Sequence, residues 1–362
     1  MSPSSSPHAR PYSLADYGWD EACEHAFAPH RAAGLIPARV VRAERGSCEA
    51  ATDAGVIRAG VPGTDDPHAS PCTGDWVALQ PAAAGRAATL HAVLERRTSL
   101  VRSSASRTSR GQVLAANVDT VAVTVSLAAP LKHARTERML ALAWESGAQP
   151  VVVLTKADLC PDTQRAEAEV SAVATGADVL LTSALTGQGL DALTAALHGT
   201  IVLLGPSGAG KSTVGNRLLG EEQLATGAVR RQDGKGRHTT AWRELLPLPG
   251  GRVLLDTPGL RAIGLHDARD GLEQTFAEIE HLAQDCRFTD CAHENEPGCA
   301  VLAAIATGEL TQRRLDSYHK LLRENAYAAS RTDARLRADR GADKKDITRH
   351  LRATYQFRER QR

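Results

Sequence analysis

The segment GPSGAGKS, residues 205–212, constrains the fold of this chain more than any other feature. It matches the phosphate-binding pattern G-x-x-x-x-G-K-[ST], with Gly205, Gly210, Lys211 and Ser212 at the fixed positions, and it joins an apolar strand to a helix. Glycines let successive N–H groups surround phosphate oxygens, and the helix N-terminus adds the positive end of its dipole. We therefore expect a nucleoside triphosphate site, in which Lys211 bridges the β- and γ-phosphates and Ser212 binds Mg²⁺. The predicted cradle also includes Ser207, Gly208, Ala209 and Thr213.

The surrounding sequence alternates apolar strands with amphipathic helices from Val118 onward. Strands that are apolar throughout predict a parallel sheet with helices on both faces. Upstream, from Ile36 to about Leu114, short β-like segments separated by Gly- and Pro-rich breaks indicate a small barrel or sandwich. The sequence is helical after about Gly271, apart from a Cys/His cluster, so we expect a multidomain α/β protein.

The length of 362 residues agrees with two or three domains. The chain contains no long apolar run, and its start, MSPSSSPHARP, lacks the apolar segment of an export signal. We therefore expect a cytoplasmic protein that makes no contact with membranes. The net charge of +1 predicts no general attraction to polyanions.

Two short loops after neighbouring predicted strands indicate which base is bound. Guanine presents N1–H and N2–H₂ side by side, and the carboxylate of Asp158 in TKAD can accept from both while the stem of Lys156 covers the ring. In TSAL, residues 182–185, Ser183 ends a strand and the N–H of Ala184 is placed to bond guanine O6. Taken alone, TKAD also fits a helix-start Asp after a strand. Thr155 occupies the position where GTPases usually carry Asn, which shortens one side chain and leaves guanine preference intact.

The segments after the phosphate loop predict the rest of the magnesium and γ-phosphate contacts. In VLLDTPG, Asp256 is placed to hold a Mg²⁺-bound water and Gly259 to offer its N–H to the γ-phosphate. In DGKGRHTT, Thr240, or failing that Thr239, completes the metal shell. Leu260 stands where many GTPases carry a water-orienting glutamine. His238 is the nearest polar candidate for that role, and a plain surface histidine fits the sequence equally well.

The order of these motifs along the chain is TKAD, SAL, GPSGAGKST, HTT, DTPG, which is the GTPase set with its last two members moved to the front. This resembles the circularly permuted GTPases, specifically the ribosome small-subunit-dependent GTPase A family (RsgA, also called YjeQ). The flanking segments YGWDEACEHAF, TGDWVAL, RRTSLVR and LAANVDTV resemble that family too. The resemblance implies hydrolysis of GTP to GDP and phosphate, stimulated by the small ribosomal subunit during its late maturation. It also suggests the hypothesis that movement at DTPG shifts the domain that follows.

We accordingly expect a monomer that binds GTP or GDP and the small subunit with its rRNA. The expected parts are a tail with a short helix (1–34), an OB-like RNA-binding barrel (35–116), a permuted GTPase domain (117–270) and a zinc-binding helical domain with a basic tail (271–362).

Cys286, Cys291, His293 and Cys299 form a compact set of one imidazole and three thiols. Such a set suits tetrahedral Zn²⁺, and four protein ligands predict a closed structural site with one ion per chain. The alternative is four unlinked packing residues. The resemblance implies that this module helps the protein to dock on the small subunit.

Two stretches carry excess positive charge and are candidates for phosphate contacts. LERRTSLVRSSASRTSR holds five arginines (Arg96, Arg97, Arg102, Arg107, Arg110) against Glu95, interleaved with Ser and Thr. The tail from Arg331 to Arg362 is also basic, and a solvated charged helix or disorder explains it equally well.

Two other functions remain open on the sequence. One is a nucleotide-gated RNA-binding switch with incidental turnover, in which small subunits leave the hydrolysis rate unchanged. The other is an ATPase or nucleoside kinase, which competition between ATP and GTP distinguishes.

Overall fold

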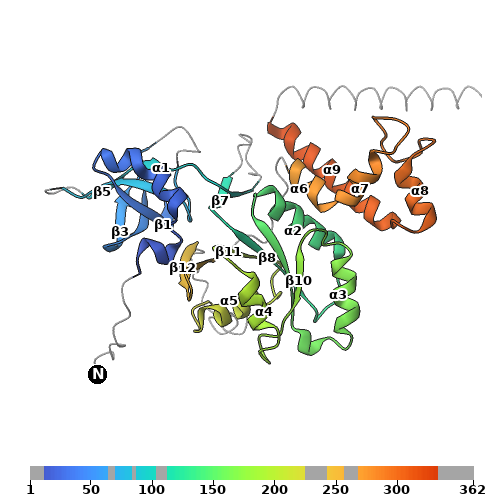
Figure 1. Ribbon diagram of the computed structural model, residues 1–362, viewed down its shortest axis with the longest axis horizontal. Coiled ribbons are helices and arrows are strands. Elements are labelled where there is room, and N and C mark those ends of the chain that lie inside the picture. Colours follow the sequence, from blue (N-terminus) through green and yellow to red (C-terminus); the bar gives the residue numbers. More distant parts are fainter. Residues whose placement is uncertain are drawn as a thin grey trace, which may run out of the picture.

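The computed structural model describes residues 12–63, 70–83, 87–102, 112–224, 243–256 and 268–332. Figure 1 shows an N-terminal barrel on one side of a central sheet and the C-terminal helices on the other. The predicted combination of barrel, parallel sheet and helical C-terminal part is confirmed. Within the described residues, no helix has both the length and the apolar character needed to cross a bilayer.

The N-terminal part is a closed barrel with a short helix packed against it. Helix α1 (Glu21–Ala32) begins where the Asp20 carboxylate accepts the N–H of Cys23 at 2.8 Å, and it buries Phe27. The sequence left open whether this part is a barrel or a sandwich. The structure shows a barrel with strand order β1-β2-β3-β5-β4. Its strands are β1 (Ile36–Glu44), β2 (Ser47–Thr52), β3 (Gly55–Gly60), β4 (Trp76–Gln80) and β5 (Ala88–Val93).

The central sheet has six strands in the order β10-β9-β8-β11-β13-β12. All pair in parallel except β12, which lies antiparallel to β13 at one edge and which the sequence analysis did not foresee. A two-stranded ladder of β6 (Ser99–Arg102) and β7 (Gln112–Ala116) precedes the sheet. The sheet strands are β8 (Thr120–Ser126), β9 (Gln149–Thr155), β10 (Asp178–Leu181), β11 (Thr200–Leu204), β12 (Glu244–Leu248) and β13 (Arg252–Asp256).

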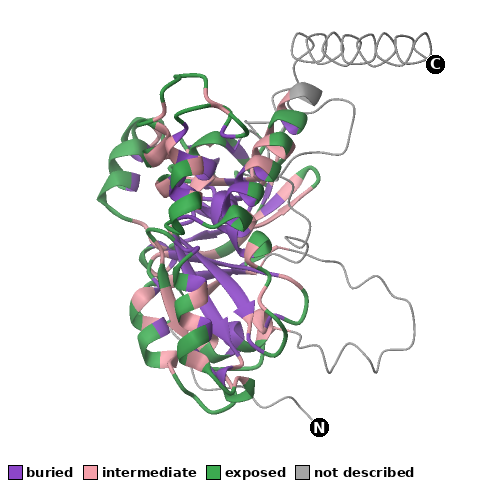
Figure 2. Cartoon of the chain, turned by 90° about the vertical axis from the view of Figure 1, so that its right-hand side faces the viewer, coloured by how far each residue is buried: buried purple, intermediate pink, exposed green. Residues whose placement is uncertain are grey.

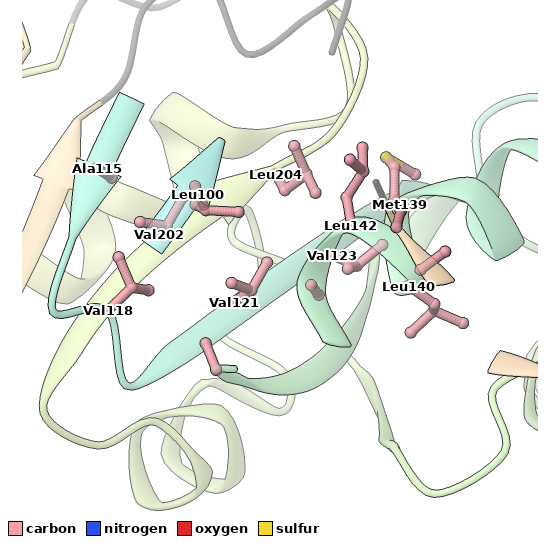
Figure 3. Close-up of a cluster of buried hydrophobic side chains, with 14 of the residues drawn as sticks. Leu100, Ala115, Val118, Val121, Val123, Met139, Leu140, Leu142, Val202 and Leu204 are labelled. Carbon is pink, nitrogen blue, oxygen red and sulfur yellow. The ribbon is translucent and has the colours of Figure 1, made fainter. Parts of the chain in front are cut away.

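Helices cover both faces of the sheet, as the apolar strands predicted. On one face, Val121, Val123 and Val202 belong to the same buried cluster as Met139 and residues of α3, and Figure 3 shows part of it. The other face packs α4 and α5 against alternate residues of the same strands. The helices are α2 (His133–Glu145), α3 (Thr163–Ser171), α4 (Leu190–Ala196) and α5 (Lys211–Leu219). Figure 2 shows the buried sheet enclosed by exposed helix surfaces.

A buried arginine joins the barrel to the sheet. Arg39 of β1 is only 2% exposed and lies 4.6 Å above the Trp76 ring. Its guanidinium donates to the carbonyl oxygens of Tyr17, Gly74 (3.3 Å) and Asn117 (3.2 Å), and to the hydroxyl of Thr200 at 2.7 Å. Burial lowers the pKa of Arg39 to about 10, so the guanidinium stays charged at neutral pH. Oxygens from both parts therefore share one cation.

The C-terminal helices dock on α2. The backbones of α2 and α6 approach so closely that a Cβ at Gly271 would come within 2.1 Å of Ala141 O. Beside this contact the carboxylate of Glu137, which is fully buried, accepts the guanidinium of Arg314 at 2.8 Å and the hydroxyl of Ser317. The C-terminal helices are α6 (Arg269–Thr275), α7 (Ala277–Ala283), α8 (Ala300–Thr307) and α9 (Gln312–Thr332).

Candidate functional site

The candidate base loop, TKAD at residues 155–158, and the phosphate loop, residues 205–210, lie in direct contact at the carboxyl edge of the sheet. Strands β9 and β11 are parallel and separated only by β8, so the loops after them emerge on the same side. The hydroxyl of Thr155 donates to Ala209 O at 2.7 Å, and the ammonium of Lys156 donates to Gly208 O at 2.8 Å. Segments more than fifty residues apart thus form one site, as the sequence predicted.

The phosphate loop, residues 205–210, has the close packing that its glycines allow. A Cβ at Gly205 would come within 2.1 Å of Thr124 Oγ1 on β8, so only glycine fits there. Gly210 has φ of 90° and directly precedes α5. The Lys211 ammonium donates to Gly205 O and Pro206 O, each at 2.8 Å. The lysine thus lies over the loop that its motif predicts it to serve.

The other phosphate-loop candidates differ in exposure. Ala209 is buried, while Ser212, at the first turn of α5, is half-buried. The exposed members are Ser207, Gly208 and Thr213. The open side of the loop is therefore lined by backbone and small side chains.

The two predicted guanine loops are held against each other. The Ser183 hydroxyl donates to the Asp158 carboxylate at 2.5 Å, and Ser183 Oγ also accepts the N–H of Thr186 at 3.2 Å. Lys156 adopts φ of 61°, a left-handed conformation that is unusual for a residue other than glycine. Among the described residues, the N–H of Ala184 has no hydrogen-bond partner. A carboxylate acceptor and an open N–H donor therefore stand on adjacent loops.

The side chain of Thr155 lies between the base loop and the phosphate loop. Its side chain is 2% exposed, and its hydroxyl faces Ala209 O of the phosphate loop, with Val125 O at a longer 3.4 Å. The shortened side chain therefore does not extend toward the base. It fastens the base loop to the phosphate loop.

The candidate magnesium contacts are only partly within the described residues. Asp256 is half-buried at the end of β13, beside β11 and its phosphate loop, and across from Glu244 of β12. Gly259 and Leu260 lie outside the described residues, as do His238, Thr239 and Thr240.

The structure brings all four candidate zinc ligands together, with their ligand atoms within 4.8 Å of one another. The Sγ atoms of Cys286 and Cys299 are 3.8 Å apart, and His293 Nδ1 lies 3.6 Å from the first and 3.4 Å from the second. Two thiolates about 2.3 Å from one Zn²⁺ are about 3.8 Å apart at the tetrahedral angle. Together with Cys291, the donor set is compatible with zinc in both chemistry and spacing.

Hydrogen bonds from backbone N–H groups to side chains of the same segment stabilise the loop around the cluster. The Glu296 carboxylate accepts the N–H groups of Ala292, Glu294 and Asn295 at 2.9 to 3.0 Å. Cys299 caps α8, because its Sγ accepts the N–H of Leu302 at 3.4 Å. Burial lowers the pKa of His293, which favours the neutral imidazole that metals bind.

Two of the candidate phosphate-contacting arginines form ion pairs within the chain, of which only that of Arg96 is largely buried. Arg96 is bound to the fully buried carboxylate of Asp75, with its Nε at 2.7 Å and Nη2 at 2.8 Å. Arg97 donates to Asp20 at 2.6 Å. Asp75 needs a cation because a buried carboxylate is costly without one. The side chain of Arg102, together with Arg107, Arg110 and residues 333–362, lies outside the described part of the chain.

One polar contact at the site has no signal in the sequence motifs. Arg217 of α5 donates from Nε to Ala184 O at 2.8 Å. No motif places an arginine at this position, so only the three-dimensional arrangement reveals the contact.

The chain is similar in sequence to known proteins over most of its length. A family model described as RsgA GTPase matches residues 93–266. The small ribosomal subunit biogenesis GTPase RsgA of Streptomyces coelicolor is 56% identical over 342 residues, which cover 93% of each chain. The protein of the same name from Opitutus terrae is 45% identical over 92% of this chain and 95% of its own.

Two solved structures share the architecture. YjeQ from Thermotoga maritima has a TM-score of 0.60 at 26% identity, covering 80% of this chain and 98% of that one. YloQ, a circularly permuted GTPase, has a TM-score of 0.57 at 25% identity, covering 80% of this chain and 95% of that one.

Proposed function

Because this chain belongs to the RsgA family of GTPases, we propose that it hydrolyses GTP to GDP and phosphate and acts in late maturation of the small ribosomal subunit. The family resemblance drawn from the motif order is confirmed. The observation that carries the proposal is the contact of base loop with phosphate loop through Thr155–Ala209 and Lys156–Gly208. One bound nucleotide can span both loops.

Base recognition is assigned to the paired guanine loops. The Asp158 carboxylate, oriented by the Ser183 hydroxyl, accepts from N1–H and N2–H₂ of guanine, and Ala184 N–H donates to O6. Thr155 acts indirectly by fixing the base loop to the phosphate loop. This arrangement favours GTP over ATP, because adenine offers neither the paired donors nor O6.

Phosphate binding and turnover are assigned to the loop at residues 205–210 and the residues after it. Its N–H groups and the Lys211 ammonium stabilise charge that builds on the phosphates as water attacks in line. Ser212 would bind Mg²⁺ and Asp256 would hold a water bound to the ion, which would neutralise phosphate charge when bound with GTP. Thr240, or Thr239 in its place, and Gly259 complete the proposed contacts with metal and γ-phosphate. His238 remains our candidate for orienting water, since Leu260 cannot.

The Cys286, Cys291, His293 and Cys299 cluster is proposed to hold one structural Zn²⁺. All four positions are protein ligands, so the ion would stabilise the fold without catalysing a reaction. We propose that this module and the barrel contact the small subunit and its rRNA. We further propose a cytoplasmic monomer, divided into parts 1–34, 35–116, 117–270 and 271–362.

A GTPase assay with and without purified small subunits tests the proposed function. We expect slow release of phosphate by the protein alone and a clear increase when subunits are added. An unchanged rate, with GTP still altering affinity for subunits, would favour the nucleotide-gated RNA switch. Equal competition by ATP would contradict the guanine assignment.

A further inference from the structure

We propose that Arg217 is a positioning residue that sets the specificity of the site for the O6 edge of guanine. This inference rests on the proposed function and goes beyond the motifs, none of which includes Arg217. It follows from how the TSAL turn is held in the structure.

Arg217 lies on the helix that also carries the phosphate loop at its N-terminus. Its side chain extends from α5 to the turn after β10, where Nε donates to Ala184 O at 2.8 Å. The two residues are 33 positions apart in the chain. A single helix therefore contacts both the phosphate end and the O6 end of the proposed nucleotide site.

Hydrogen bonds hold the turn on either side of Ala184. Ser183 N–H donates to Gln188 O, and Gly187 N–H donates to Ser183 O, both at 2.9 Å. The Ser183 side chain accepts from Thr186 and donates to Asp158. Among the described residues, Arg217 is the only hydrogen-bond donor to Ala184 O.

The bond to Arg217 holds the peptide plane that follows Ala184, next to the plane that contains its N–H. The carbonyl and the N–H of Ala184 belong to successive peptide planes, which are related only by the φ and ψ of this residue. Gly187 holds the peptide that carries the N–H of Ala184, through the carbonyl of Ser183, and Arg217 holds the next peptide, so that the two bonds together restrict both angles. The N–H of Ala184 then keeps one direction, with no protein acceptor among the described residues to compete for it.

Ser183 and Arg217 orient groups that contact different edges of the base. Ser183 orients Asp158, which reads N1–H and N2–H₂, whereas Arg217 orients Ala184, which reads O6. Loss of Arg217 should therefore weaken discrimination at O6 alone. A general loosening of the site would weaken discrimination at both edges.

The experiment measures dissociation constants of the full chain for three diphosphates. GDP is the reference, 6-thio-GDP changes only O6, and IDP lacks only the 2-amino group. The variant is Arg217→Ala, and the control is Arg252→Ala, because Arg252 also donates to a backbone carbonyl, Thr194 O at 2.6 Å, on another element. Arg217→Lys, which keeps a donor, is the second variant.

In Arg217→Ala we expect the preference for GDP over 6-thio-GDP to fall by about threefold to tenfold, as loss of one charge-assisted hydrogen bond predicts. The preference for GDP over IDP should stay unchanged. Arg217→Lys should lie between the wild type and Arg217→Ala, and Arg252→Ala should match the wild type.

Two results would overturn the inference while leaving the proposed function intact. One is an unchanged GDP to 6-thio-GDP ratio in Arg217→Ala, and the other is an equal fall in both ratios. A wild-type protein that binds IDP as tightly as GDP would instead contradict the proposed function itself.

Discussion

At Asp158, exchanging one carboxylate oxygen for an amide nitrogen should change which base is bound. Its carboxylate accepts from Ser183, and in our proposal it also accepts from the two adjacent donors of guanine. An amide in its place presents a donor as well as an acceptor, which fits the O2 carbonyl of xanthine.

We therefore predict that Asp158→Asn lowers affinity for GDP by at least about tenfold and raises affinity for xanthosine diphosphate. Direct binding measurements with both diphosphates check this. Asp162→Asn is the matched control, because Asp162 caps α3 through the N–H of Arg165 and asparagine caps equally well. Unaltered GDP affinity in Asp158→Asn would refute the base contact.

Residues such as Lys211 and Asp158 were predictable because their motifs are local in sequence and follow strands. The partners of Thr155 and Arg217 were not, because these bonds join loops that only the strand order brings together. The partner of Arg96 was unpredictable for the same reason. A run of arginines resembles an RNA surface until the fold places the buried Asp75 beside one of them.

At the scale of elements, the charged side chain of the N-cap residue Asp20 stabilises the first turn of α1. Burial acts to raise the pKa of Asp20, but the bonds from Cys23 N–H and Arg97 outweigh it and hold the pKa at about 2. Because this pKa is lower in the folded chain than the ordinary value near 4, Asp20 stabilises the fold above about pH 4 and loses that effect as pH falls toward 2.

We predict that Asp20→Ala lowers the stability of the barrel by about 1 kcal/mol at pH 7. The difference from wild type should shrink at pH 3, where protonation begins to remove the advantage of the charged cap. Urea unfolding followed by the fluorescence of Trp19, which packs against Phe27 and Trp76, measures both values. A difference that grows on acidification would contradict the assignment.

The contact of α2 with α9 depends on a buried ion pair. Arg314 is 3% exposed and bonds both Glu137 and Glu278, at 2.8 and 2.5 Å. Removing the cation alone leaves Glu137 buried with its charge only partly matched by Arg313.

Arg314→Met is therefore expected to destabilise the chain by about 3 kcal/mol, and Arg314→Met combined with Glu137→Leu to recover most of that loss. Denaturant unfolding of the single and double variants measures the recovery. A double variant no more stable than the single one would show that Glu137 carries no uncompensated charge.

At the scale of the whole molecule, the C-terminal module (268–332), which holds the Cys286, Cys291, His293 and Cys299 cluster, is distant in sequence from the guanine loops, and its described residues make none of the contacts at them. Its helices dock on α2, on the opposite side of the sheet from the barrel (Figure 1). Nucleotide chemistry and attachment to the small subunit should therefore be separable.

We predict one Zn²⁺ per chain by metal analysis. Removal of the ion with a chelator should leave turnover by the protein alone within about twofold, while stimulation by small subunits is lost, because a structural ion takes part in no chemical step. Cys291→Ser should reproduce the loss. Full stimulation of the metal-free protein would contradict the assigned role.

The close approach of α6 to α2 at Gly271 limits how a γ-phosphate signal can travel. The chain leaves the sheet at Asp256 and enters α6 at Ala268, whose N–H bonds Asn325 Oδ1 of α9. Leu255, next to Asp256, and Ala268 belong to the same buried cluster. Displacing the C-terminal module by a change at DTPG would first require separating two backbones in contact and a buried ion pair.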